Sequence, residues 1–196
     1  MRLTVQSAAI LFVLYFLSVV SASAATSHIE VEKELVAEVF FGYSKATSRS
    51  DFQKAATFIH PDHLRGLREH TLLALIEARQ HRQNKDNPIL DLFFEGISVA
   101  SAAELTGAEV SARLEYAIAA LIPGVLESAH LDNINLMSVD ILPEDKAIVR
   151  YETRFHGQTK EVVKRFQKSN GKWYLTLDAQ PEETAAGLKE ILMKPL

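Results

Sequence analysis

Hydrophobic positions recur with two different periods along the chain, and the point where the period changes divides it in two. Up to about residue 130, apolar side chains return every three to four positions, which is typical of amphipathic helices. From Asn133 onward they return at every second position, which is typical of half-buried strands. The pattern therefore predicts an α+β fold in which helices come first and an antiparallel sheet follows them.

Helix-start signals divide the first part into separate helices. A capping box, in which Ser or Thr is followed three positions later by Glu or Gln, satisfies free N–H groups, and it occurs at Ser27, Ser50, Ser101 and Thr106. Pro61 suits the first position of another helix, which should run to about Ala78. The longest predicted helix follows Thr106 and should end near Pro123. Its expected buried face consists of Val110, Leu114, Ile118, Leu121, Ile122 and Val125.

The second part of the chain predicts a meander of four strands joined by tight turns. The expected strands span residues 134–142, 147–155, 161–168 and 173–178. The turn at Ser169-Asn170-Gly171 is a strong hairpin signal, because Asn and Gly tolerate the positive φ angles that such turns need. Outside the meander, we expect a short strand at Ile97–Ala100 and a final helix from Pro181 to about Met193 that docks on the outside.

The first 24 residues have the pattern of a secretory signal peptide. Arg2 is their only charged residue, an apolar run extends from Ala8 to Val20, and small residues lead to Ala24. A membrane-spanning helix needs roughly 20 apolar residues, so this run of about 13 is short for an uncleaved anchor, which is the alternative. We expect cleavage near Ala24, a single domain at 25–196, and a soluble product in the periplasm or outside the cell.

Composition and charge exclude several classes of protein. The 196-residue chain is 47% apolar and 23% charged, as globular domains are, and has no Cys that could form disulfides, thiolate metal sites or nucleophiles. A net charge of −4 argues against a nucleic-acid partner. The charge is uneven, because residues 86–145 carry eleven acids and one base whereas residues 146–172 carry eight bases and two acids.

Two segments resemble the nuclear-transport-factor-2-like, or SnoaL-like, superfamily. DFQKAATFIHPD, from Asp51 to Asp62, is similar to the family's short second helix and Pro-Asp loop, and FQKSNGKWYLTLD, from Phe166 to Asp178, is similar to its last hairpin. The resemblance implies a cone in which N-terminal helices pack on a curved four-stranded antiparallel meander, with a pocket at the wide end. The C-terminal helix is an addition to that fold. Some members are isomerases or dehydratases, and many only bind or dimerise.

The expected function is that of an exported small-ligand-binding or interaction domain with an apolar pocket and no cofactor. The ligand would be small and apolar or lipid-like, unless Phe93 and Phe94 fill the pocket. The predicted ligand-binding residues are Phe40, Tyr43, Tyr151, Phe155 and Trp173. A homodimer formed through the outer face of the sheet and an accessory subunit with an exposed apolar patch are further possibilities.

The alternative function is a cofactor-free isomerase or dehydratase that transfers protons with a pocket Tyr and Asp. Its candidate residues are Tyr43, Asp140, Tyr151 and Asp178, which would supply a general base and a phenolic donor. The ordinary interpretation is a pair of core tyrosines with satisfied hydroxyls and two solvated aspartates. An Asp that faces a closed cavity beside a tyrosine hydroxyl would favour the enzyme.

Two further clusters have chemical interpretations. His60, His63 and His70 are metal-ligand types, but helix-boundary and surface roles explain them better, and we expect no metal. The basic hairpin between Lys146 and Lys172 is either a docking face for an acidic partner or anionic lipid, or a solvated sheet face. The basic residues considered for that face are Arg150, Arg154, Lys160, Lys164, Arg165, Lys168 and Lys172.

Overall fold

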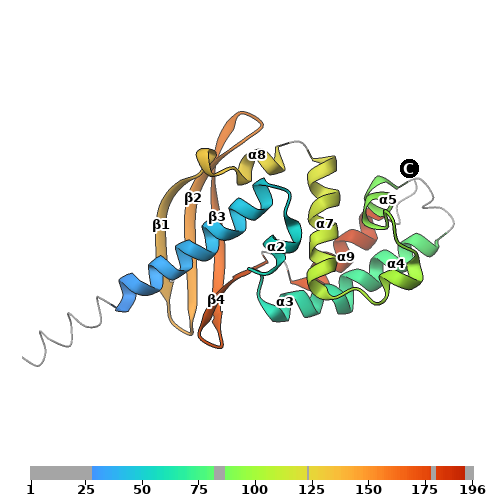
Figure 1. Ribbon diagram of the computed structural model, residues 1–196, viewed down its shortest axis with the longest axis horizontal. Coiled ribbons are helices and arrows are strands. Elements are labelled where there is room, and N and C mark those ends of the chain that lie inside the picture. Colours follow the sequence, from blue (N-terminus) through green and yellow to red (C-terminus); the bar gives the residue numbers. More distant parts are fainter. Residues whose placement is uncertain (1–27, 82–86, 123, 178–179, 193–196) are drawn as a thin grey trace, which may run out of the picture.

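The structure is a computed structural model that describes residues 28–81, 87–122, 124–177 and 180–192. It has a sheet with a helix across one face and a group of packed helices beside the sheet (Figure 1), so the predicted α+β fold is confirmed. The predicted signal peptide and the capping box at Ser27 lie outside the described residues. None of the helices in the described ranges is long and apolar enough to span a bilayer.

The sheet is the predicted meander. Its strands are β1 (Asn135–Leu142), β2 (Lys146–Phe155), β3 (Gln158–Ser169) and β4 (Lys172–Thr176), antiparallel and in the order β1-β2-β3-β4. β3 begins three residues before its predicted start, because the tight turn at His156 and Gly157 lets residues 158–160 pair with β2. In β2 every second residue from Ala147 to Thr153 is buried, so one face of the sheet is the inner face.

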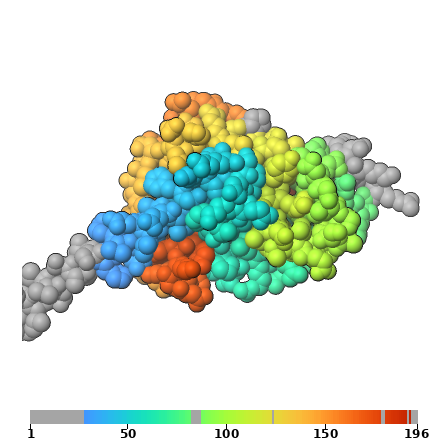
Figure 2. Space-filling model, viewed as in Figure 1, coloured from blue at the N-terminus to red at the C-terminus, as the bar shows by residue number. Residues whose placement is uncertain are grey.

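The N-terminal helix, residues 28–48, lies across the inner face of the sheet (Figures 1 and 2). Its Val36 and Phe40 are almost completely buried in one hydrophobic cluster with side chains from the sheet. Those sheet residues are Ala147, Val149, Tyr151, Phe166, Trp173 and Leu175. The helix therefore supplies the apolar cover that the inner face of an open sheet needs in water.

The other helices form the second half of the molecule. They are α2 (Phe52–Ala56), α3 (Pro61–Gly66), the π-helical turn η1 (Leu67–Thr71), α4 (Leu72–Gln80), α5 (Pro88–Phe93), α6 (Val99–Ala102), α7 (Gly107–Leu121), α8 (Val125–Ala129), the 3₁₀ turn η3 (Leu131–Asn133) and α9 (Pro181–Leu192). The helix predicted from Pro61 is thus one rod that contains a π-helical turn. α9 packs against η1 and α4, where Leu192 is buried. Phe93 and Phe94 belong to this second cluster and not to the one under the sheet.

Several helix starts and faces differ from the predictions. The capping box at Thr106 is confirmed, with reciprocal bonds to Glu109. The boxes at Ser50 and Ser101 are wrong, because Asp51 and Ser98 accept the capping N–H groups instead. The strand predicted at 97–100 is also wrong, since the cap at Ser98 starts α6 there.

The predicted buried face of α7 is correct only in its first half. Val110 and Leu114 are buried, but Ile118, Leu121 and Ile122 are exposed by 39–45%. The buried stripe continues through Ala117 instead.

The two halves are joined beside β4. Leu175 donates its N–H to the carbonyl of Phe58 at 2.8 Å, and His60 donates its N–H to the carbonyl of Leu175 at 2.9 Å. These bonds occupy the edge of β4 at Leu175, so another chain cannot pair with the strand at that position. They also place the segment between α2 and α3 directly on the sheet.

Candidate functional site

A cavity of about 300 Å³ lies between the N-terminal helix, the inner face of β2 and β3, and α8. Five aromatic residues contribute to its wall, namely Phe40, Tyr43, Tyr151, Phe155 and Phe166. Four of the five residues predicted to bind a ligand are among them. The structure therefore brings Phe40, Tyr43, Tyr151 and Phe155 together at one cavity, while the Phe93 and Phe94 side chains lie in the helical half.

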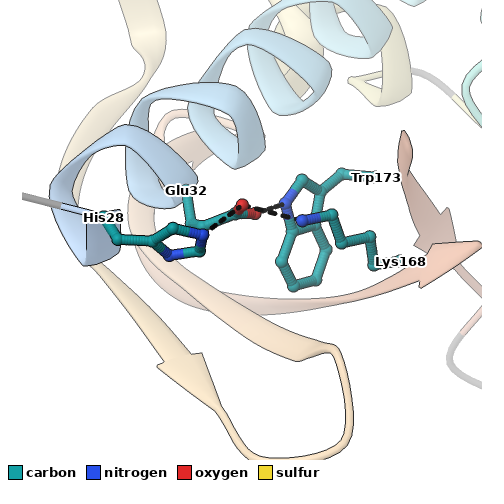
Figure 3. A network of polar contacts seen from close by, with 4 residues as sticks. All are labelled: His28, Glu32, Lys168 and Trp173. Carbon is teal, nitrogen blue, oxygen red and sulfur yellow. Dashed lines mark hydrogen bonds and ion pairs between the residues drawn. The ribbon is translucent and has the colours of Figure 1, made fainter. Parts of the chain in front are cut away.

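Trp173, the fifth predicted ligand-binding residue, lies elsewhere and has another partner. Its indole nitrogen donates a 2.6 Å hydrogen bond to Glu32 Oε2 (Figure 3). The Lys168 ammonium donates to Glu32 Oε1 at 2.7 Å, and His28 Nε2 lies 3.8 Å from that oxygen. Because Glu32 is buried, this network ties the start of the N-terminal helix to the β3–β4 hairpin.

Two lysines of the basic hairpin lie on the inner face of the sheet. Lys164 is the partner of Val149 and Lys160 is the partner of Thr153, and both Val149 and Thr153 are buried. Both lysines line the cavity, and Lys160 Nζ lies 5.1 Å from the centre of the Phe155 ring. Arg150 alternates with these positions and projects from the outer face. The hairpin's positive charge is therefore divided between two faces of the sheet.

The residue that sequence reasoning missed is Glu115 of α7. Its Oε2 atom is buried without a hydrogen-bond partner among the described residues, and Ser111 Oγ lies 3.4 Å from Oε1. Burial raises the pKa of Glu115 to about 7, although the nearby Lys164 opposes the shift. The sequence spacing could have indicated this position. Glu115 lies four residues after Ser111, on the same side of the helix, and it directly follows Leu114 of the buried stripe.

Tyr43 connects Glu115 with the cavity. Its side chain lines the cavity, and burial raises the pKa of its hydroxyl, with the Glu115 charge adding to the shift. One turn along the same helix, the Thr47 hydroxyl oxygen is buried; it interacts with the Tyr43 hydroxyl, which opposes the rise in the Tyr43 pKa, and has no partner within hydrogen-bond distance in the described part of the chain. Unpaired buried polar atoms are uncommon in folded proteins, and those beside a cavity mark where water or a ligand can bind.

Asp140, the described aspartate of the two predicted for proton transfer, is not brought to this cavity. Asp140 is exposed on the outer face of β1, where its Oδ2 accepts a 3.0 Å hydrogen bond from Ser138 and lies 3.8 Å from Arg150 Nε. Asp178 lies outside the described residues. Of the three predicted catalytic residues that the structure describes, Tyr43 and Tyr151 line the cavity.

Two of the three histidines considered as metal ligands are neighbours, since the ring centres of His60 and His63 lie 6.0 Å apart. His60 caps α3, because its Nδ1 accepts the N–H of Asp62 at 3.2 Å, and His70 Nε2 lies 3.1 Å from Glu182 of α9. Burial lowers the pKa of His63, whose Nδ1 has no partner among the described residues. Within those same ranges, no three or more His, Asp or Glu side chains are grouped as a metal site requires.

No protein family, curated protein or solved structure matched the chain when it was compared with them. The resemblance to the nuclear-transport-factor-2-like superfamily therefore stays a prediction.

Proposed function

We propose that the chain binds a small, mostly apolar molecule in the cavity between the N-terminal helix and strands β2 and β3. The cavity itself carries the proposal, because four aromatic side chains that the pattern of the chain singled out converge on it. Export to the periplasm or the outside, after removal of residues 1–24, is part of the proposal and is supported by the signal-peptide pattern.

The size and lining of the cavity support a small ligand. Its 300 Å³ equals the volume of about ten water molecules at roughly 30 Å³ each. Small-molecule sites are mostly apolar cavities of roughly 300–1,000 Å³ with a few polar groups that orient the ligand. The aromatic rings provide the apolar wall here, and the Thr47 hydroxyl is a polar group available to a ligand.

The test measures binding of two eight-carbon probes, octan-1-ol and octanoate, by NMR titration of the backbone amides. We expect shifts at cavity residues, and we expect Ala129→Phe to abolish them because Ala129 lines the cavity and a phenyl ring would fill it. Ala120→Phe, at an exposed position of α7, is the matched control and should bind as the wild type does. If neither probe shifts the cavity amides of the wild type, the proposal is wrong.

Proton transfer is the second candidate function, and one observation favours it. The Glu115 carboxyl has a pKa of about 7 and lies near Tyr43, so a general base and a phenolic donor are close together. Glu115 does not line the cavity, however, and this places the enzyme second. Solvent-deuterium incorporation next to the carbonyl of cyclohexanone, lost in Glu115→Gln, would support it, and no incorporation above buffer would refute it.

A further inference from the structure

The inner face of β3 carries an unusual pattern for a core-facing strand. Positions 160, 162, 164 and 166 share this face and are occupied by Lys, Val, Lys and Phe. Val162 and Phe166 belong to the hydrophobic cluster under the N-terminal helix, so apolar side chains suit the face. Lysine is seldom placed toward a core. Both of these lysines line the cavity, and Lys164 is half-buried there.

The charge on the cavity wall has one sign. Apart from Lys160 and Lys164, the described lining residues are aromatic, aliphatic or hydroxyl-bearing, and none of them is Asp or Glu. Glu115 does not line the cavity, but its carboxyl interacts electrostatically with Lys164. Burial raises the pKa of Glu115 to about 7, so below neutral pH it compensates little of the lysine charge.

We infer that the cavity selects an apolar molecule with one carboxylate, whose head lies at Lys164 and whose body packs among the aromatic rings. The inference rests on the proposed function and names its ligand class. The buried Thr47 hydroxyl lines the cavity beside Tyr43, has no partner within hydrogen-bond distance in the described part of the chain, and can donate to the same carboxylate. The apolar part of the ligand can contain about ten groups of the size of a water molecule, because that number fills the cavity volume. A medium-chain fatty acid or a small aromatic acid has this size.

The experiment compares three probes with the same eight-carbon chain and different heads: octanoate, octan-1-ol and octylammonium. Dissociation constants are measured for the full purified chain at pH 6 and low salt. We expect octanoate to bind about tenfold more tightly than the alcohol, as one charge-assisted hydrogen bond allows. Octylammonium should bind more weakly than the alcohol, because the wall repels it. 1-Naphthoate, compared with octanoate, then distinguishes an aromatic body from an aliphatic one, because the two probes share the carboxylate head.

Three variants locate the head group. Lys164→Met should remove the preference for octanoate and leave the affinity for octan-1-ol within about twofold, while Lys164→Arg should restore the preference because it keeps the charge. Lys45→Met, at an exposed position of the N-terminal helix, is the control for loss of one surface charge. If Lys164→Met does not fold, the affinities of the wild type for the three probes still show whether the cavity prefers a carboxylate head group.

The outcomes separate this inference from the proposed function. Equal binding of all three heads overturns the selection of a carboxylate and leaves a cavity that binds apolar molecules. An octanoate preference that survives in Lys164→Met places the head elsewhere and overturns the assignment to Lys164. If no probe binds at the cavity, the proposed function fails and this inference fails with it.

Discussion

The Trp173 indole donates its N–H to Glu32 Oε2 at 2.6 Å, across 141 positions of sequence (Figure 3). Lys168 donates to the other carboxylate oxygen, so both oxygens of a buried glutamate are bonded to one hairpin. Buried carboxylates are stable only when they are paired and hydrogen-bonded. Glu32 therefore fixes where the N-terminal helix begins on the sheet, and this helix covers the cavity further along its length.

Replacing Glu32 by Gln should lower the free energy of unfolding by about 2 kcal/mol at pH 7, because hydrogen bonds to a charged group are lost. Urea unfolding measures the change. Glu30→Gln removes an exposed carboxylate that pairs with Lys33 at 2.8 Å, and as the control it should cost well under about 1 kcal/mol.

The same variant should show a defined pH dependence. The hydrogen bond from Lys168 and then that from Trp173 hold the pKa of Glu32 below its usual range. The stability that it contributes is present above the unfolded pKa of about 4.3 and is lost as the pH falls through the folded pKa. The difference between wild type and Glu32→Gln should therefore shrink in acid, and an equal difference at pH 3 and pH 7 contradicts the assigned role.

Glu115 should have the opposite dependence. Its pKa of about 7 lies above the unfolded value of about 4.3, so the folded chain holds the proton more tightly. Its ionisation therefore lowers stability as the pH rises from about 4.3 to about 7. Glu115→Gln should match the wild type near pH 4 and be more stable at pH 8, on the order of 3–4 kcal/mol.

Chemical denaturation at several pH values measures this difference, with Glu34→Gln as the control at an exposed position of the N-terminal helix. The control should change little between the two pH values. A Glu115→Gln variant whose stability relative to wild type is the same at pH 4 and pH 8 would show that burial does not perturb this carboxyl.

Gly107 should not tolerate a side chain, although it lies in the first turn of α7. A Cβ atom there would collide with the backbone carbonyl of Leu64, where α3 crosses the start of α7. Gly107→Ala should destabilise the chain by roughly 1–3 kcal/mol. Gly187→Ala in α9 is the matched control, because its Cβ meets open space and the change should stabilise by about 0.5–1 kcal/mol. Thermal unfolding of the two variants measures both changes in stability. Equal changes for Gly107→Ala and Gly187→Ala would refute the close contact between Gly107 and Leu64.

Removal of divalent metal should leave the protein unchanged. His60 and His70 have other partners, and the described residues include no cluster of three or more His, Asp or Glu that suits a metal. An excess of EDTA is therefore expected to leave Tm where it was. A fall in Tm that zinc reverses would show a metal site, since a metal that binds only the folded state stabilises it.

The elements were predictable wherever their signals are local. The period-two pattern located the four strands to within three residues at their ends, and Thr106 with Glu109 marked the start of α7. Local signals failed where two neighbours compete, as at Asp51, which caps α2 in place of Ser50. The prediction that Ile118 of α7 is buried was wrong for another reason. Its exposure depends on where the other helices pack, and the pattern within α7 does not contain that information.

The candidate site divides in the same way. The four aromatic residues of the cavity wall could be predicted because they lie on apolar stripes, and a stripe shows which residues share one face of a helix or strand. Trp173 lies on such a stripe as well, but its partner Glu32 is on a helix 141 positions earlier, and no local pattern specifies that pairing. Lys164 was counted with outward-facing cations because the register that turns it inward became evident only from its pairing with Val149.

The amino-acid pattern alone determined the order and type of the elements, because helix and strand periods and capping bonds act between residues a few positions apart. The folded chain was needed to show that Glu115 of α7 lies near Tyr43 and Lys164. Contacts between distant segments depend on how whole elements pack, and packing exposes or buries a charged group in a way that its neighbours in sequence do not reveal.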